Sequence, residues 1–128
     1  MRRSVYLLVR RTFLYPMFAA FDPPEVMTSC ARRFQTVVPT QALTLLNSPL
    51  AREQAAAFAR RLLAENGPRP EAVAGRAWVL AFGRPISEQE SQYVRAFLEA
   101  RTRESTHETA LNELCLALFN ANEFLSIE

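Results

Sequence analysis

The sequence predicts an all-α protein of about five helices in a small antiparallel bundle, with an irregular N-terminal segment. Glycine occurs only 3 times in the 128 residues, which disfavours turn-rich β architectures and suits helices. Beyond residue 38, apolar residues recur at the three- and four-residue spacing of amphipathic helices. Between these stripes stand residues that are typical of helix starts and ends.

The first two expected helices meet at a serine followed by a proline. Pro39 suits the first turn of a helix whose apolar run ends at Asn47. Ser48 then provides an N-cap and Pro49 a first helical position for the second helix. That helix ends at 66–68 (Asn-Gly-Pro), and its stripe consists of Ala55, Phe58, Ala59, Leu62 and Leu63.

The third helix is expected from about Pro70 to Phe82, with Gly83 as its C-terminal cap and Pro85 preventing its continuation. Residues 87–90 (Ser-Glu-Gln-Glu) form a capping box that opens a fourth helix. The inward side chains predicted for the third and fourth helices are Ala74, Ala77, Trp78, Ala81, Phe82, Tyr93, Val94, Phe97 and Leu98.

A second capping-box pattern at 105–108 predicts the start of the fifth helix. In it Ser105 is the N-cap and the Glu108 carboxylate accepts a hydrogen bond from the Ser105 N–H. The stripe of this helix is Leu111, Leu114, Cys115, Leu118 and Phe119, and it fades at 120–122. Because the loops between helices span three to six residues, neighbouring helices are expected to pack antiparallel.

Residues 1–38 form the irregular segment, which is rich in proline, aromatic residues and arginine. Residues 4–10 are compatible with either a strand or a helix. Residues 1–40 carry six Arg against Asp22 and Glu25, a balance of +4, whereas residues 41–128 carry nine Arg against eleven Glu, a balance of −2. We expect a single domain over 1–128, with the irregular segment followed by a helical body over 39–128.

The chain offers few groups for catalysis or metal binding. It has one histidine, His107, and two cysteines, Cys30 and Cys115. A zinc site closes with four ligands, and a serine or cysteine nucleophile needs a nearby base. We therefore predict no catalytic, cofactor-binding or metal-binding residue, and no enzymatic activity of this chain alone. His107 is expected to be solvated at a helix start and Cys115 to be a buried thiol, although a disulfide to Cys30 stays open.

The arginine pairs of the N-terminal segment are the remaining candidates for binding. Arginine beside aromatic residues can bind nucleic acid, so this function is one alternative, but pairing with carbonyls and carboxylates within the segment is the favoured interpretation. The candidate binding surface is Arg10, Arg11, Arg32, Arg33 and Gln41. Arg10 and Arg11 precede an apolar run that is shorter than a signal-peptide core, and no stretch is long enough to span a membrane.

Several segments, taken in order, resemble the planctomycete-specific domain family of the PSD-one type, a domain of unknown function. They are residues 2–7 with 10–12, 21–24, Cys30 with Arg32 and Arg33, Thr36 with 39–48, 81–85 with Glu88 or Glu90, and 116–125. The chain resembles the C-terminal part of this domain, because Met1 corresponds to the middle of it. The resemblance implies a larger, exported protein, periplasmic or at the cell surface, with cytochrome c modules, and hence haem, upstream.

From the resemblance and the missing chemistry we expect a non-enzymatic interaction or scaffold module that contacts the upstream domains or another protein. A second hypothesis is that the chain forms one wall of an active site in a larger polymer-processing or redox enzyme. Arg32, Arg33 and Gln41 would then line a cleft. The resemblance assigns no catalytic residue, and no cofactor is expected within this chain.

Overall fold

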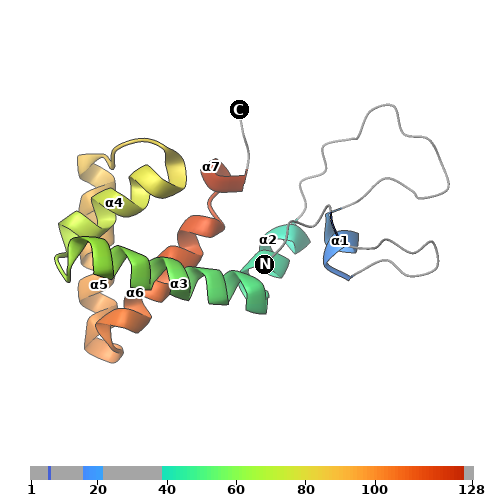
Figure 1. The fold of residues 1–128 in the computed structure, drawn as a ribbon, viewed down its shortest axis with the longest axis horizontal. Coiled ribbons are helices and arrows are strands. Elements are labelled where there is room, and N and C mark those ends of the chain that lie inside the picture. Colours follow the sequence, from blue (N-terminus) through green and yellow to red (C-terminus); the bar gives the residue numbers. More distant parts are fainter. Residues whose placement is uncertain (1–5, 7–15, 22–38, 126–128) are drawn as a thin grey trace. The chain divides into compact units, whose positions relative to one another are not determined.

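A computed structural model of the chain describes residue 6, residues 16–21 and residues 39–125. The chain divides into two compact units, residues 1–44 and residues 45–128. Every regular secondary-structure element in the described ranges is a helix (Figure 1), so the all-α class is confirmed. The expectation of a single domain over 1–128, with an irregular segment over 1–38 and a helical body over 39–128, stays a prediction.

The first unit contains α1 (Pro16–Ala20) and the first residues of α2 (Pro39–Asn47). The Phe21 N–H donates to the Phe18 carbonyl at 3.0 Å and closes α1. In α2, the Thr44 hydroxyl donates to the Thr40 carbonyl at 2.7 Å. The strand-or-helix alternative for 4–10 and the state of Cys30 fall outside the described residues.

The junction between α2 and α3 (Pro49–Asn66) lies where the serine and proline predict it. Ser48 occupies the N-cap position with extended backbone angles (φ −64°, ψ 126°) and Pro49 begins the helix, but the Ser48 hydroxyl makes no capping hydrogen bond. The Ser48 N–H instead donates to the Leu45 carbonyl at 3.3 Å, within the last turn of α2. The position of the helix start is confirmed, and proline geometry rather than a serine cap defines it.

Glycine ends both α3 and α4 (Pro70–Phe82). Gly67 and Gly83 have positive φ angles of 67° and 71°, which favour a residue without a Cβ. Their N–H groups donate to the carbonyls of Leu63 and Val79 at 2.9 and 3.1 Å. Both helix ends therefore lie where the sequence predicts them.

The predicted capping box opens α5 (Glu88–Glu104). The Ser87 hydroxyl accepts from the Glu90 N–H at 3.3 Å, and the Glu90 carboxylate accepts from the Ser87 N–H at 2.8 Å. Tyr93 was expected to point inward from this helix, which is wrong, because it is 67 % exposed. Around the helix it lies about 100° from the buried Val94 and about 140° from the buried Leu98.

The capping box predicted at Ser105 and Glu108 is also wrong, by one residue. Thr106 is the N-cap of α6 (His107–Phe119), and its hydroxyl accepts from the Thr109 N–H at 3.2 Å. Ser105 still belongs to the end of α5, where its hydroxyl donates to the Arg101 carbonyl at 3.0 Å. The serine that matches the pattern is therefore already bonded to the preceding helix.

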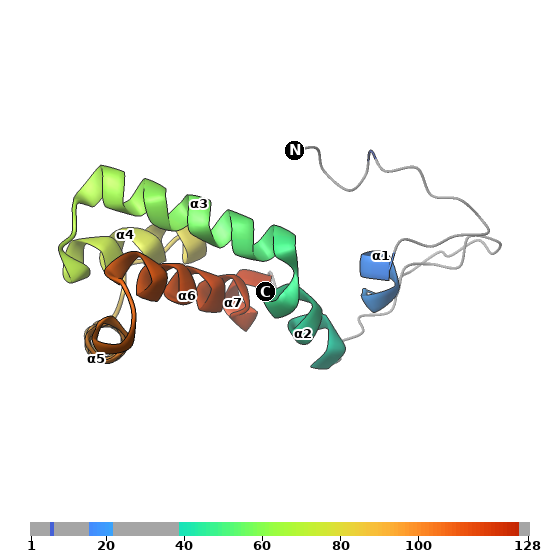
Figure 2. The same cartoon turned by 90° about the horizontal axis from the view of Figure 1, so that it is seen from below.

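The body of the second unit is built on α3 and α6, which run in opposite directions and make the most extensive contact between any two helices (Figures 1 and 2). Helix α4 packs against α3, and α5 packs against α4 and α6. Figure 2 shows α5 end-on while α3 and α6 lie in the plane of the view, so α5 crosses them. The short α7 (Asn122–Leu125) contacts α4 and α6.

The core of this unit is entirely apolar, since no described polar or charged residue is buried. Helix α6 contributes more buried side chains than any other helix. The buried residues are Ala55, Ala59, Leu62, Val73, Ala74, Ala77, Trp78, Val94, Leu98, Ala110, Leu111, Leu114, Cys115 and Leu118. The stripes predicted for α3, α4 and α6 thus supply the core, and α5 contributes Val94 and Leu98.

Candidate functional site

The binding surface predicted from the sequence is not assembled among the described residues. Arg10, Arg11, Arg32 and Arg33 lie outside them. Gln41 lies on α2 and is half-buried. The nucleic-acid and active-site-wall hypotheses, which depend on these side chains, therefore stay predictions.

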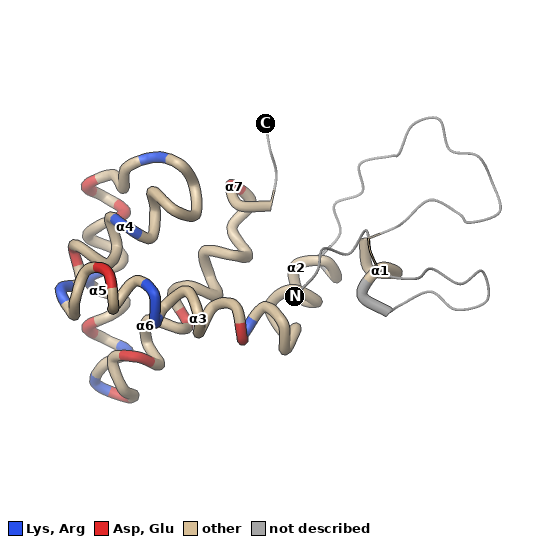
Figure 3. The backbone as a smooth tube through the Cα atoms, in the orientation of Figure 1, with Lys and Arg blue, Asp and Glu red and all other residues tan. Residues whose placement is uncertain are grey.

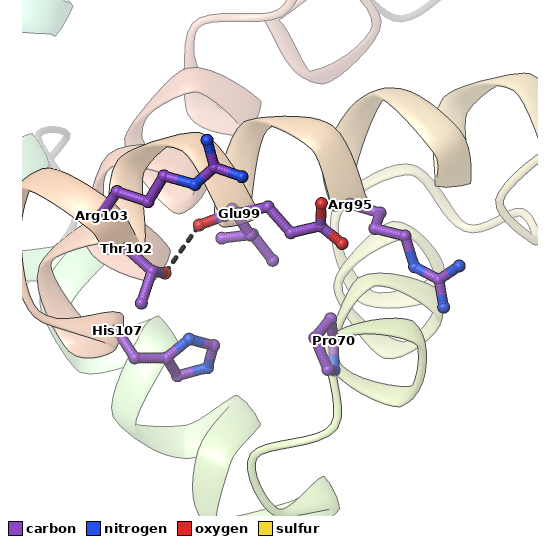
Figure 4. Close-up of a pocket in the computed structure, with 7 residues that line it drawn as sticks. Pro70, Arg95, Glu99, Thr102, Arg103 and His107 are labelled. Carbon is purple, nitrogen blue, oxygen red and sulfur yellow. Dashed lines mark hydrogen bonds between the residues drawn. The ribbon is translucent and has the colours of Figure 1, made fainter.

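Two surface grooves of the second unit are lined by described residues. The first, here called the α5–α6 groove, has a volume of about 380 Å³. It lies between the start of α4, the second half of α5 and the start of α6. Figure 4 shows its lining residues, which are Pro70, Arg95, Leu98, Glu99, Thr102, Arg103 and His107.

The polar groups of the α5–α6 groove do not converge on a common point. The Thr102 hydroxyl donates to the Leu98 carbonyl at 2.6 Å, and Arg95 forms an ion pair with Glu71 at the start of α4. In Figure 4 the guanidinium of Arg103 points away from the His107 ring. A binding site for a small charged ligand needs several polar groups aimed at one position, and this groove does not provide them.

His107 differs from the expectation of a solvated ring. The residue is half-buried, and its Nε2 is buried with no hydrogen-bond partner in the described part of the chain. A general base must lie within hydrogen-bond reach of the group that it activates. No described hydroxyl, thiol or carboxylate has such a hydrogen bond to His107, so the ring and its neighbours do not form a nucleophile–base pair.

The second groove, here called the α3–α6 groove, has a volume of about 460 Å³. It lies along the first half of α3 and the first three turns of α6. Its apolar lining is Leu46, Ala55, Ala56 and Leu116, and its polar lining is Asn47, Arg52, Thr109, Asn112 and Glu113. The sequence did not reveal this groove, because its two sides lie more than fifty residues apart along the chain.

The lining of the α3–α6 groove includes an exposed leucine, Leu46, which is 41 % exposed. Single exposed apolar residues are common on protein surfaces, but an exposed leucine that lines a groove together with two alanines and a second leucine is typical of interaction sites. This groove is therefore the best candidate for a functional surface among the described residues.

The two charged residues of the α3–α6 groove differ in their pairing. Glu113 accepts from Arg101 Nε at 2.7 Å, and Arg101 also pairs with Glu104 at 3.0 Å. The hydrogen bond and the charge of Glu113, and to a smaller extent those of Glu104, hold the pKa of the Arg101 guanidinium above its usual value. Arg52 is exposed and forms no ion pair with any described residue. The groove therefore presents one positive charge that no described residue compensates.

A different cluster, centred on Arg84, holds the ends of three helices together. The Arg84 guanidinium donates to both carboxylate oxygens of Glu90 at 2.7 and 3.0 Å, and to both of Glu123 at 2.6 and 2.8 Å. Hydrogen bonds to Arg84 hold the pKa of both carboxyl groups below the usual value. The cluster joins α4, α5 and α7.

The Arg84 cluster is saturated by its own partners. Arg84 Nη1 also donates to the Pro85 carbonyl at 3.3 Å, and the guanidinium carbon lies 5.7 Å from the centre of the Phe82 ring. Glu90 in addition caps α5 through Ser87. With every part of the guanidinium engaged inside the fold, the role that this geometry supports is structural.

The remaining candidates offer no reactive centre within the described residues. Cys115 is a buried free thiol, and burial raises its pKa to about 12. No group of three or more potential metal ligands occurs in the ranges that the structure covers. None of the described helices is long and apolar enough to cross a membrane.

The described part of the chain is all-α, and its surface has no assembled catalytic centre. The chain belongs to the PSD1 family, described as a protein of unknown function (DUF1553), whose sequence model matches residues 1–98. The resemblance stated from the sequence is confirmed at the level of this family. Neither a curated protein nor a solved structure matches the chain.

Proposed function

We propose that this chain is a non-enzymatic helical interaction module of a larger, exported planctomycete protein associated with cytochrome c domains. Its partners are the upstream domains of that protein or another protein. The resemblance described above supports the proposal, because it implies a longer, exported protein with cytochrome c modules, and hence haem, upstream. The haem belongs to those modules, and no residue of this chain is assigned to it.

The observation that carries the proposal is the α3–α6 groove with its exposed Leu46. Folded proteins bury most of their large aliphatic side chains, so a groove that leaves Leu46 at the surface gains from being covered. Acidic and basic residues are interspersed along α3, α4 and α5 (Figure 3), which argues against a surface specialised for phosphate or acidic lipid. An apolar groove with a polar margin instead suits a protein partner.

The first test is the genomic sequence immediately upstream of Met1. An in-frame continuation that encodes an export signal and Cys-x-x-Cys-His haem-attachment motifs would support a larger cytochrome-associated protein. A stop codon directly upstream, with no such modules in the neighbouring genes, would contradict this part of the proposal.

The second test is co-purification of the upstream polypeptide with the 128-residue chain, each produced separately. We expect a complex on size-exclusion chromatography that Ala56→Trp abolishes, because the large ring fills the α3–α6 groove. The matched control is Ala57→Trp, on the same helix but exposed and outside the groove. Enzymatic turnover by the isolated chain that a single polar substitution removes would overturn the non-enzymatic assignment.

A further inference from the structure

We propose that the α3–α6 groove seats an amphipathic, acidic helix of a partner protein. This inference rests on the proposed function and specifies the partner of the same site. The occupant's apolar face lies against the leucine and alanine side chains of the groove, and a carboxylate on its margin pairs with Arg52.

The shape of the groove favours a helix as the occupant. Its sides are two antiparallel helices (Figure 2), and a third helix packs in such a depression by placing its side-chain ridges between theirs. Ala55 and Ala56 lie next to each other in the lining, and such small side chains allow an approaching helix to come close. Leu46 and Leu116 provide the larger apolar contacts on either side.

The charges of the groove favour an acidic occupant. Glu113 already pairs with Arg101 at 2.7 Å, so it has a cationic partner within the fold. Arg52 has no ion-pair partner in the described part of the chain. A carboxylate on the occupant compensates Arg52, whereas a lysine or arginine at the same place meets a like charge.

Asn112 provides a second polar contact. Its Oδ1 is buried without a hydrogen-bond donor among the described residues, although the residue lines the groove. Leaving a buried acceptor unpaired is unfavourable. A donor side chain on the occupant gives the amide a partner once the amide turns toward the groove.

The test uses two synthetic amphipathic helices of about 20 residues, long enough to be helical in water. Both have the same leucine and alanine face, and their polar positions carry either glutamate or lysine. Binding of each labelled peptide to the full 128-residue chain is measured by fluorescence anisotropy. We expect the glutamate peptide to bind at least about fivefold more tightly, and the preference to fade as salt is added, because the discriminating charge is exposed.

Four variants locate the binding site. Arg52→Glu is expected to reverse the preference between the peptides, whereas Arg60→Glu, exposed on the same helix and outside the groove, leaves it unchanged. Ala56→Trp is expected to lower the affinity for both peptides by about tenfold or more, because the tryptophan side chain blocks the groove. Ala57→Trp is the control. Circular dichroism and thermal unfolding establish that each variant is folded.

Equal affinity for the two peptides, no binding of the glutamate peptide, or equal effects of the Ala56 and Ala57 variants would overturn the inference. Its failure is distinguishable from failure of the proposed function. If the upstream polypeptide still binds in an Ala56-dependent manner while the glutamate peptide does not, the groove is an interface for a partner of different chemistry. If neither binds, both proposals are wrong.

Discussion

Arg84 and Glu123 lie 39 residues apart in the sequence and form a two-pronged ion pair at 2.6 and 2.8 Å. The same guanidinium donates two further hydrogen bonds to Glu90. Bidentate binding of a carboxylate is specific to arginine, because its planar guanidinium can donate two parallel hydrogen bonds and an ammonium group cannot. The pair connects α4 to α7 and, with the ring contact between Phe119 and Phe124 at 5.0 Å, holds α7 on the helical body.

Replacing Arg84 by lysine is therefore expected to loosen α7 while the rest of the fold persists. Lysine retains the charge but cannot make the bidentate hydrogen bonds. The amides of Phe124 and Leu125, which donate to the Ala121 carbonyl, are therefore expected to lose protection from hydrogen exchange. Hydrogen exchange at these amides should become roughly tenfold faster or more. Arg60→Lys is the control, because Arg60 has no ion pair among the described residues. If hydrogen exchange is unchanged in Arg84→Lys, the bidentate ion pair is not needed to hold α7, and the aromatic contact alone is sufficient.

The same cluster predicts a loss of stability in acid. The folded state holds the pKa of Glu90 and of Glu123 below the usual value of 4.5. The stabilisation is thus fully present above the unfolded-state pKa and is lost as the pH falls through the folded-state pKa. Melting temperatures of the wild type and Glu90→Gln, measured from pH 7 to pH 3, should differ at neutral pH, and the difference should shrink as the pH falls below about 4.5. A difference independent of pH would contradict this mechanism.

The start of α6 can be tested with two neighbouring substitutions. Thr106→Ala removes the N-cap and is expected to lower the free energy of unfolding by about 1 kcal/mol. Ser105→Ala removes only the hydroxyl bond to the Arg101 carbonyl and is expected to cost less. Urea denaturation of both variants measures the difference. The reverse order would restore Ser105 as the cap of α6.

These two caps illustrate how far the sequence predicts the fold. At 87–90 the pattern alone gives the correct cap, because a proline-containing loop separates Ser87 from α4 and leaves its hydroxyl available. At 105–108 the same pattern fails, because α5 continues to Glu104 and its last turn binds Ser105. A local motif predicts a helix start correctly only when the preceding helix has already ended.

The predicted stripe of α6 gives the largest expected effect on stability. Leu111 is fully buried between the helices, and Leu111→Ala is expected to lower the free energy of unfolding by about 2–5 kcal/mol. Leu50→Ala, at an exposed position, should be close to neutral. Equilibrium denaturation of both variants provides the comparison. A small effect at Leu111 would mean that α6 is not part of the core.

Cys115 is expected to be inert in the folded protein. With its pKa raised to about 12 by burial, its thiolate fraction at pH 8 is roughly a thousandfold below that of a free cysteine. In a Cys30→Ser variant, which leaves Cys115 as the single thiol, labelling by a disulfide reagent should therefore proceed only as fast as the protein opens. Rapid labelling under native conditions would contradict the buried position.

The candidate site was less predictable than the fold. Periodicity along one helix identifies its buried side, but the α3–α6 groove arises from residues such as Ala56 and Leu116 that meet only through tertiary packing. The candidates chosen from the sequence were conspicuous arginines, because charge can be seen without a structure. Arg52 matters because it has no ion-pair partner among the residues that the structure describes, and it cannot be distinguished from other arginines until the packing is known.

The pairing of α3 with α6 also has a consequence during protein synthesis. Helix α3 ends at Asn66 and α6 at Phe119, so about fifty residues must be added before α3 meets its main partner. At typical translation rates this takes roughly 3–10 seconds. Throughout that interval the side of α3 that packs against α6 is exposed on the nascent chain, and a chaperone that binds aliphatic helical surfaces would find its target there before α6 is made.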